Sequence, residues 1–192
     1  AGLAASPARA NDQTTIIQGG GIGTSAGTDE TAGIYIGVDA GKGSLLLNNI
    51  DNIGIVMQAG MSVDGSYNIT TGYYSGEKVT GDSNTAYGVF SGRSVTGSYN
   101  TATGYWSGGN VTGDGNIATG FYSGGDVTGD NNTATGVAAG RSVEGSGNTA
   151  AGHNAGRFVE GGGNPAAGND AGESVKGGGN TAAGLAAGRS VT

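Results

Sequence analysis

Gly97-Ser-Tyr-Asn-Thr-Ala-Thr-Gly-Tyr-Trp-Ser-Gly-Gly-Asn-Val-Thr112 is one of eight sixteen-residue units that fill residues 65–192 without an insertion or a deletion. The units begin at Gly65, Gly81, Gly97, Gly113, Gly129, Gly145, Gly161 and Gly177. A fixed period of this length is typical of architectures built by stacking one small structural unit on the next. We therefore number the positions of each unit 1 to 16 and compare the units position by position.

We call the residues at one position of successive units a column. Columns of Gly, Val and Asn are the same in all eight units. Position 8 is Gly (Gly72, Gly88, Gly104, Gly120, Gly136 and onward to Gly184), and position 12 is also always Gly. Position 15 is Val (Val79, Val95, Val111, Val127, Val143 and onward to Val191). Position 4 is Asn: Asn68, Asn84, Asn100, Asn116, Asn132, Asn148, Asn164 and Asn180. Position 6 is Ala except at Thr70, and position 11 is Ser in four units and Ala in four.

These columns predict an all-β solenoid of sixteen-residue coils. Alternating positions 4, 6 and 8 share one face of a strand, and their small or polar side chains suit a narrow interior. Each coil has room for two strands of about five residues and two turns. The Gly columns fit turns with positive φ or close backbone approach, and the Asn column fits either a ladder of stacked amides or a turn. Helix is disfavoured because Gly, Asn and Thr recur throughout.

The chain divides into three parts. We expect a flexible N-terminal end over residues 1–13, irregular coils over residues 14–64, and the eight regular coils over residues 65–192, continuous with the irregular ones. The irregular part repeats Gly-x-x-Ala-Gly at 23–27 and 37–41, and residues 52–64 align with the later units, with Val56 in place of the position-8 Gly. We also expect the sequence to be a piece of a longer protein.

Composition excludes several functional classes. The net charge of −7 disfavours nucleic acid and acidic membrane surfaces as partners, and there is no Cys for disulfides or thiolate chemistry. No apolar run approaches the length of a membrane helix, so direct membrane contact by this segment is not expected. No nucleophile–base pair, phosphate-binding loop or repeated calcium motif is present. We therefore expect no enzymatic activity and no cofactor.

The expected core is thin, which has a consequence for assembly. Ordering the backbone costs roughly 1–2 kcal/mol per residue, and Ala, Ser and Gly return little transfer free energy on burial. The outward positions 5 and 7 carry β-prone residues such as Ile69, Thr85 and Ile117. We therefore expect this face to pack against neighbouring chains in an oligomer.

The unit Asn-Thr-Ala-Thr-Gly-x-x-Ser resembles the head repeat of YadA-like trimeric autotransporter adhesins, Ser-Val-Ala-Ile-Gly-x-x-Ser. The likeness rests on Ala at position 6, Gly at position 8 and Ser or Ala at position 11, and it extends over about residues 21–192. It implies a left-handed parallel β-roll, assembled as a side-by-side homotrimer. It also implies a bacterial cell-surface location, with anchoring in the outer membrane through C-terminal parts beyond this segment.

Three departures from that family pattern stand out. The period is sixteen where the family commonly uses fourteen, Asn replaces the first Ser, and Thr or Ala stands where Val and Ile would face the trimer axis. The function implied is attachment to host extracellular-matrix or cell-surface molecules, or to the same head on another cell. Similar repeats in phage tail fibres make a structural fibre segment the alternative, and an ice-binding solenoid is a third interpretation. The third rests on Thr-x-Thr pairs, whose column breaks at Ala151, Ala167 and Ala183.

Large aromatic rings occupy positions 9 and 10 in the first four units, except at Val89, and are absent from these positions in the last four. Two interpretations remain open: an adhesive surface, because aromatic residues dominate binding hot spots, or rings packed between subunits. Strand alternation predicts that position 9 packs between subunits and position 10 faces solvent, unless a turn spans both. The predicted ligand surface is therefore the position-10 set: Tyr74, Phe90, Trp106 and Tyr122.

Two weaker features concern charged and polar residues. His153 and Asn154 stand one unit before Asn169 and Asp170, a poor ligand set for a metal, so we interpret them as exposed polar residues. Position 13 changes sign along Arg141, Arg157, Glu173 and Arg189, and position 16 carries Glu144 and Glu160. Such columns predict surface ion pairs, each contributing about 0–1 kcal/mol.

Overall fold

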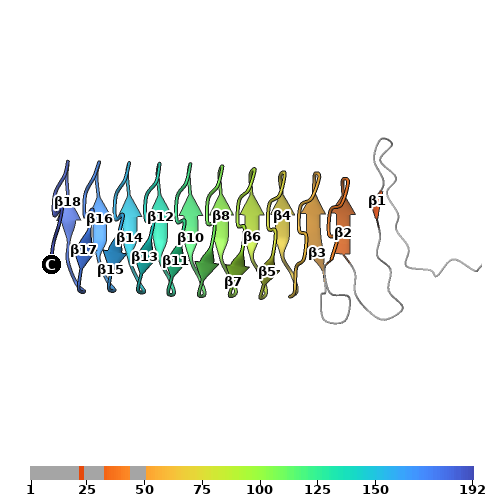
Figure 1. Ribbon diagram of the computed structural model, residues 1–192, viewed down its shortest axis with the longest axis horizontal. Helices are drawn as coiled ribbons and strands as arrows, with labels where there is room; N and C mark the ends of the chain where they lie inside the picture. Colours follow the sequence, from red (N-terminus) through yellow and green to blue (C-terminus); the bar gives the residue numbers. More distant parts are fainter. Residues whose placement is uncertain (1–21, 24–32, 44–50) are drawn as a thin grey trace, which may run out of the picture.

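The computed structural model describes residues 22–23, 33–43 and 51–192, and it is an all-β solenoid of stacked parallel strands (Figure 1). The expected all-β solenoid of parallel strands and the sixteen-residue coil are confirmed. The coils succeed one another along the long axis, from the orange N-terminal strands to the blue C-terminal ones. The predicted flexible end at residues 1–13 lies outside the described residues, as does most of 14–32.

One long sheet forms one wall of the solenoid. It contains eleven strands. In order they are β1 (Ile22–Gly23), β2 (Gly33–Ile36), β3 (Asn52–Ile55), β4 (Ile69–Thr71), β6 (Thr85–Tyr87), β8 (Thr101–Thr103), β10 (Ile117–Thr119), β12 (Thr133–Thr135), β14 (Thr149–Ala151), β16 (Pro165–Ala167) and β18 (Ala182–Ala183). Strand β1 pairs antiparallel with β2, and the other neighbours pair in parallel.

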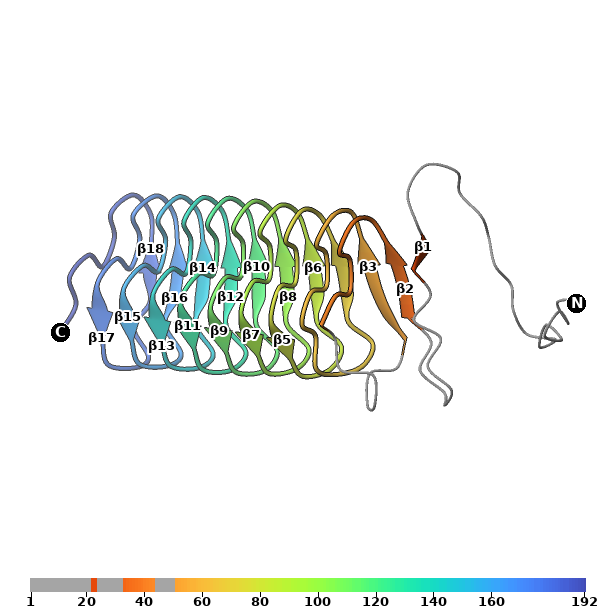
Figure 2. The ribbon, with the colours of Figure 1, turned by 45° about the vertical axis from the view of Figure 1, so that its right-hand side comes forward.

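A second sheet forms the opposite wall (Figure 2). Its seven parallel strands are β5 (Val79–Thr80), β7 (Val95–Thr96), β9 (Val111–Thr112), β11 (Val127–Thr128), β13 (Val143–Glu144), β15 (Val159–Glu160) and β17 (Val175–Lys176). Each pairs with the strand sixteen residues away, as in Val127 with Val143. In both sheets, therefore, identical positions of successive units stand directly above one another.

The described N-terminal coils depart from the regular spacing. Gly33 of β2 is paired with Asn52 of β3, a separation of 19 residues rather than 16. Val56 occupies the place of the position-8 Gly, with a φ of 90°. Gly37 stands at the same place one coil earlier, with a φ of 136°.

The interior is as narrow as the column pattern predicts. The position-15 valines form one continuous buried cluster from Val63 to Val175. Facing them are the position-6 alanines and the position-11 residues, and Ser75, Ser91, Ser107 and Ser123 are fully buried. Each of these hydroxyls donates to the position-6 carbonyl oxygen of the next coil, as in Ser91 Oγ to Ala102 O at 2.9 Å. The serines are therefore accommodated without an unsatisfied polar group.

The Asn column forms an amide ladder inside the solenoid. Asn116 Nδ2 donates to Asn100 Oδ1 at 3.1 Å and to Gly129 O at 2.9 Å. Its Oδ1 accepts from both the backbone N–H and the Nδ2 of Asn132, each at 3.0 Å. The same pattern recurs from Asn84 to Asn164. Of the two interpretations open from the sequence, the ladder is the one observed.

The strands are shorter than the predicted five residues, at three on one wall and two on the other in most regular coils. The reason is that positions 3, 10, 12 and 14 have left-handed backbone, for example Tyr99 (φ 61°), Trp106 (φ 53°) and Ser94 (φ 59°). Hydrogen bonds between coils nevertheless continue through these positions, as in Trp106 N–H to Val89 O at 3.1 Å. Almost the whole coil is thus bonded to its neighbours, strand or not.

Candidate functional site

The outer face of the long sheet exposes apolar side chains that a single chain leaves uncovered. Positions 5 and 7 point outward, and Ile34, Ile69, Tyr87 and Ile117 are between 43% and 61% exposed. Large side chains occur in the N-terminal and central coils, whereas the last three coils carry Thr, Ala and Pro. This gradient interrupts any regular lattice of Thr side chains, which speaks against the ice-binding interpretation.

A second surface lies where the chain turns after the long sheet. We call the rings at positions 9 and 10 of coils one to four the aromatic edge: Tyr73, Tyr74, Phe90, Tyr105, Trp106, Phe121 and Tyr122. Rings of the position-10 column follow one another at 5.6 Å (Tyr74–Phe90), 5.0 Å (Phe90–Trp106) and 5.9 Å (Trp106–Tyr122) between centroids. Their spacing follows from the ladder of hydrogen bonds between coils.

The strand alternation expected across positions 9 and 10 does not apply, because the turn spans both. Position 9 is the more exposed of the two in the single chain, with Tyr105 at 44% and Phe121 at 50%, while the four position-10 rings are half-buried. The ligand surface predicted at Tyr74, Phe90, Trp106 and Tyr122 therefore forms the base of the aromatic edge, and Tyr105 and Phe121 form its outer part. Its binding role stays a prediction.

Arginine side chains cover part of the ring surface. The Arg93 guanidinium carbon lies 5.9 Å from the centroid of the Phe90 ring and 5.7 Å from that of the Trp106 ring. Its Nε donates to Glu77 at 2.6 Å, which fixes the side chain against the rings. Arg141 stands 5.7 Å from the Tyr122 ring at the end of the aromatic edge. The edge thus combines aromatic surface with arginine guanidinium groups beside the rings. This combination suits ligands with both apolar and anionic groups.

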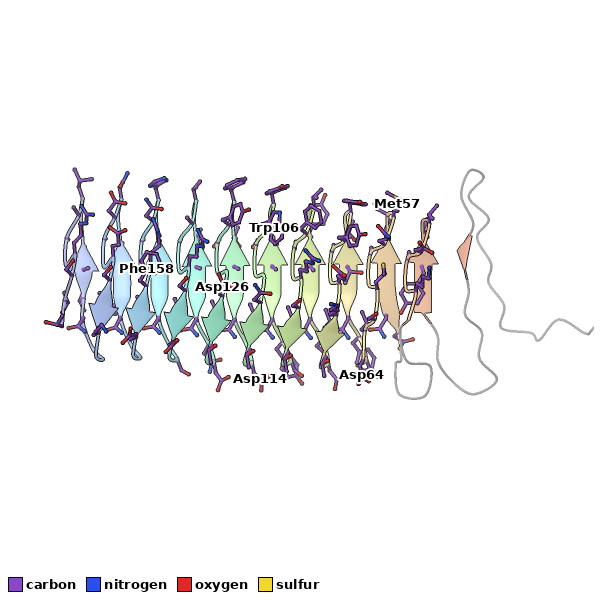
Figure 3. All side chains as sticks on the ribbon, viewed as in Figure 1. Met57, Asp64, Trp106, Asp114, Asp126 and Phe158 are labelled. Carbon is purple, nitrogen blue, oxygen red and sulfur yellow. The ribbon has the colours of Figure 1, made fainter. Side chains whose placement is uncertain are left out.

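The opposite edge of the solenoid is acidic. It was not predicted as a candidate surface from the sequence. Position 2 is Asp or Ser in the first six units. From Asp82 to Ser146, each side chain accepts the backbone N–H of the same position one coil earlier, as in Ser98 N–H to Asp114 Oδ1 at 2.7 Å. Asp114 N–H donates in turn to Asp130 Oδ1 at 2.9 Å. The signal was present in the column of Asp82, Ser98, Asp114, Asp130 and Ser146. Figure 3 shows Asp64 and Asp114 on the edge opposite Trp106.

Between the two edges, the outer face of the second sheet is hollowed. An open hollow of about 440 Å³ is lined by residues of positions 14 to 16: Asn110, Asp126, Thr128, Ser142, Glu144, Phe158, Val159 and Glu160. Three of these are carboxylates and none is basic. The interior, by contrast, holds a cavity of only about 30 Å³, too small for a ligand.

The remaining polar candidates are surface residues. His153 is exposed, and Asn154 Nδ2 donates to Asp170 Oδ1 at 2.9 Å. Within the described ranges, no three His, Cys, Asp or Glu side chains gather as metal ligands would. The predicted ion pairs along position 13 are present, at 3.8 Å for Arg157–Glu173 and 2.9 Å for Arg189–Glu173. No helix in the described part of the chain is long and apolar enough to cross a membrane.

Comparison with known proteins adds no identity: no protein-family model, no curated protein and no solved structure matches this chain.

Proposed function

We propose that this chain is the head of a bacterial surface adhesin, a left-handed β-roll that assembles with two further copies side by side. The observation that carries the proposal is the outer face of the long sheet. Its outward Ile and Tyr side chains lie on a continuous wall of parallel strands, and a partner surface would remove them from water. Exposed apolar side chains gathered on one face mark interaction sites in soluble proteins.

The thin interior supports assembly independently. The largest side chain in the regular core is Val, and the rest of the interior is Ala, Ser, Asn and Gly. Burial of apolar area contributes about 25 cal/mol per Å², so these small residues offset only part of the backbone entropy. Packing three such walls around a common axis adds the missing apolar burial.

The aromatic edge is the proposed ligand surface. It would remain on the outside of a side-by-side assembly whose long sheets face inward. Its partners would be host extracellular-matrix or cell-surface molecules, or the same head on another cell. In this proposal the head stands at the bacterial surface, anchored in the outer membrane through C-terminal parts of a longer protein.

Assembly can be tested directly on the purified chain. Light scattering coupled to size exclusion should give three chains per particle, because contact with other copies would remove the apolar side chains of the outer wall from water. The measurement should be repeated over a hundredfold range of protein concentration. A folded and stable monomer throughout that range would contradict both the trimer and the argument from the thin core.

Ligand binding should depend on the outer rings of the aromatic edge. In a screen against immobilised matrix proteins, the double variant Tyr105→Ala, Phe121→Ala should retain under a tenth of the binding of the original chain, since hot-spot rings commonly contribute ~2 kcal/mol or more each. The matched control is Phe158→Ala, which removes a ring of similar exposure, 46%, away from the edge.

The same variants separate the two interpretations of the rings. If the rings pack between subunits instead, Tyr105→Ala and Phe121→Ala will lower the melting temperature and dissociate the assembly while the isolated chain keeps its fold. Trp106 is the only Trp and lies between Phe90 and Tyr122, so its fluorescence should change when a ligand occupies the edge. Unchanged emission on saturation with a bound ligand would place binding elsewhere.

A further inference from the structure

The aromatic edge ends abruptly between coils four and five. Phe121 and Tyr122 occupy positions 9 and 10 of coil four, and Val137 and Ala138 occupy the same positions of coil five. The backbone N–H of Ala138 donates to Phe121 O at 2.8 Å, so the two coils are in direct contact at this turn. The two rings therefore rise above the smaller side chains that follow them. We call this place the step and define it by these four residues and the neighbouring Arg141.

The rings of the step have only one face stacked on another ring of the edge. Tyr105 stacks on Phe121 with 5.4 Å between centroids and 9° between the ring planes. Trp106 lies on Tyr122 at 5.9 Å and 2°. Because these rings are nearly parallel and succeed one another along the solenoid, the second face of Phe121 and of Tyr122 is directed towards coil five. Positions 9 and 10 of coil five carry no ring.

Arg141 covers the second face of Tyr122 and leaves that of Phe121 open. Its guanidinium carbon lies over the Tyr122 ring, 5.7 Å from the centroid. Within residues 51–192, the ring contacts of Phe121 are with Tyr105 and Tyr122, and no arginine lies over it. Phe121 is 50% exposed, and Val137 beyond it is too short to cover the outer part of the ring. The step thus presents an open ring face beside a guanidinium.

Arg141 also differs from the other arginines of the regular coils, because no ion pair in residues 51–192 involves it. The other three each contact a glutamate, and these pairs are Arg93–Glu77, Arg157–Glu173 and Arg189–Glu173. The carboxylates of the acidic edge are remote from the step, since Figure 3 shows Asp64 and Asp114 on the edge opposite Trp106. The guanidinium N–H groups of Arg141 are therefore open to an anion from outside the chain.

Polar side chains follow the step in coil six. His153 occupies position 9 and is exposed, two coils beyond Phe121, or about 10 Å along the axis at the usual spacing of neighbouring strands. Asn154 occupies position 10, and its Nδ2 donates to Asp170 Oδ1 at 2.9 Å, which orients the amide. Imidazole and amide groups at this distance can exchange hydrogen bonds with the hydroxyl groups of a ligand that lies along the step.

We propose that the step binds an acidic sugar of a glycan, with the apolar face of the sugar ring on Phe121 and the sugar carboxylate on Arg141. This inference rests on the adhesive role proposed above and names the class of cell-surface molecule that the aromatic edge recognises. The C–H groups of a sugar ring carry partial positive charge and are attracted to the negative face of an aromatic ring. A guanidinium donates two parallel hydrogen bonds to a carboxylate.

Neither half of the step is sufficient for binding by itself. The net charge of −7 repels anions at long range, so a small anion that lacks an apolar face gains little at Arg141. A neutral sugar can stack on Phe121 but leaves the guanidinium without a partner. An aromatic carboxylate satisfies both groups but has no hydroxyls for His153 and Asn154. A carboxylated sugar is the ligand that uses the ring, the cation and the polar side chains together.

Pairs of acidic and neutral oligosaccharides test the ligand class. Isothermal titration calorimetry on the purified chain would compare 3′-sialyllactose with lactose, and a hyaluronan tetrasaccharide with its carboxyl-reduced form. At least one acidic probe should bind about tenfold more tightly than its neutral counterpart, because only the acid engages the guanidinium. The two acidic probes distinguish a sialic acid from a uronic acid. Equal affinity within both pairs, or no binding of either acid, would overturn the proposal.

Two variants locate the binding at the step. Arg141→Gln should weaken the acidic probe about tenfold, and Phe121→Leu should do the same, since leucine is apolar but has no flat face. Arg157→Gln is the matched control, because it removes the same charge at the same position one coil later, where Glu173 already pairs with it. It should leave the affinity unchanged. Equal losses for the two arginine variants would show general electrostatic attraction and no site at the step.

The same measurements separate this site from the wider adhesive role. Attachment to matrix proteins that requires Tyr105 and Phe121 but is unchanged in Arg141→Gln, together with no binding of the acidic probes, would remove the sugar site and leave the adhesive edge standing. Binding of an acidic probe that Arg141→Gln abolishes would support the site even if the chain attached to no matrix protein. Melting temperatures of all variants should equal that of the original chain, which shows that the losses come from the surface.

Discussion

Gly104→Val should unfold the central coils of the solenoid, with a loss of about 3–5 kcal/mol in the free energy of unfolding. Gly104 has a φ of 129°, which side chains with a Cβ rarely adopt. A Cβ there would overlap the carbonyl oxygen of Gly120 and lie 2.9 Å from its carbonyl carbon. The same backbone contact repeats on both sides, so neither neighbour can move away. Urea denaturation followed by circular dichroism measures the loss.

Two further variants make this test specific. Ser94→Asn is the matched control, because Ser94 has a φ of 59° and Asn110 occupies the same place one coil later. It should change the urea midpoint little; Ser94→Val would not serve, since a β-branched residue is strained at that φ. Val56→Gly is the reciprocal change at an irregular coil, where Val stands at a φ of 90°. It should stabilise the chain. A similar loss for Gly104→Val and Ser94→Asn would refute the steric argument.

The invariant columns were enough to predict the interior. Asn, Gly and Val admit few roles at a sixteen-residue period, and the structure places them in the amide ladder, at the close contacts and in the core. Ser and Ala at position 11 are interchangeable because both fit the buried space, and the Ser hydroxyl finds a carbonyl oxygen. Small residues in fixed columns are informative because a larger residue would not fit.

The left-handed backbone could not be predicted at positions where the residue type varies from unit to unit. Positions 3, 10 and 14 are left-handed throughout, yet they carry Tyr99, Trp106 and Phe158 as well as Gly, Asn and Asp. Left-handed backbone was indicated only by the Gly, Asn and Asp residues at these positions, since these residue types favour such turns. They are Gly115, Asn131, Asn110 and Asp126. The large residues are held there by hydrogen bonds between coils, a tertiary effect that no local preference reveals. The same left-handed positions make the strands shorter than predicted.

The candidate surfaces were predicted in part. The aromatic residues were evident from their columns, but their relative exposure was not, because the turn spans both positions and alternation fails there. Charge pairs along position 13 were predictable from spacing alone. The opposed edges were not, because they depend on which columns the folded coil brings to the same side.

Asn116→Ala should be the most damaging polar substitution, with an expected loss of about 3–5 kcal/mol. The side chain serves four hydrogen bonds at once. Its removal leaves the backbone N–H of Asn132 without its acceptor and Gly129 O without this donor. Each such buried group costs about 1–3 kcal/mol. Because a solenoid is held together coil by coil, the damage should concentrate where coils four and five meet. Hydrogen exchange at residues 117–135 should therefore accelerate more than exchange at 165–175.

Two variants separate the ladder from a general sensitivity to Asn replacement. Asn110→Ser removes an exposed amide that bonds to Asp126, at a position where Ser94 and Ser142 already occur, and it should cost under about 1 kcal/mol. Asn116→Asp keeps the shape and an acceptor oxygen but loses both donated bonds, and it sets a carboxylate against Asn100 Oδ1 and Gly129 O. It should therefore destabilise nearly as much as Asn116→Ala. If Asn116→Asp instead behaved like Asn110→Ser, the donated bonds would contribute little, and the constancy of the Asn column would have to come from its accepted bonds alone.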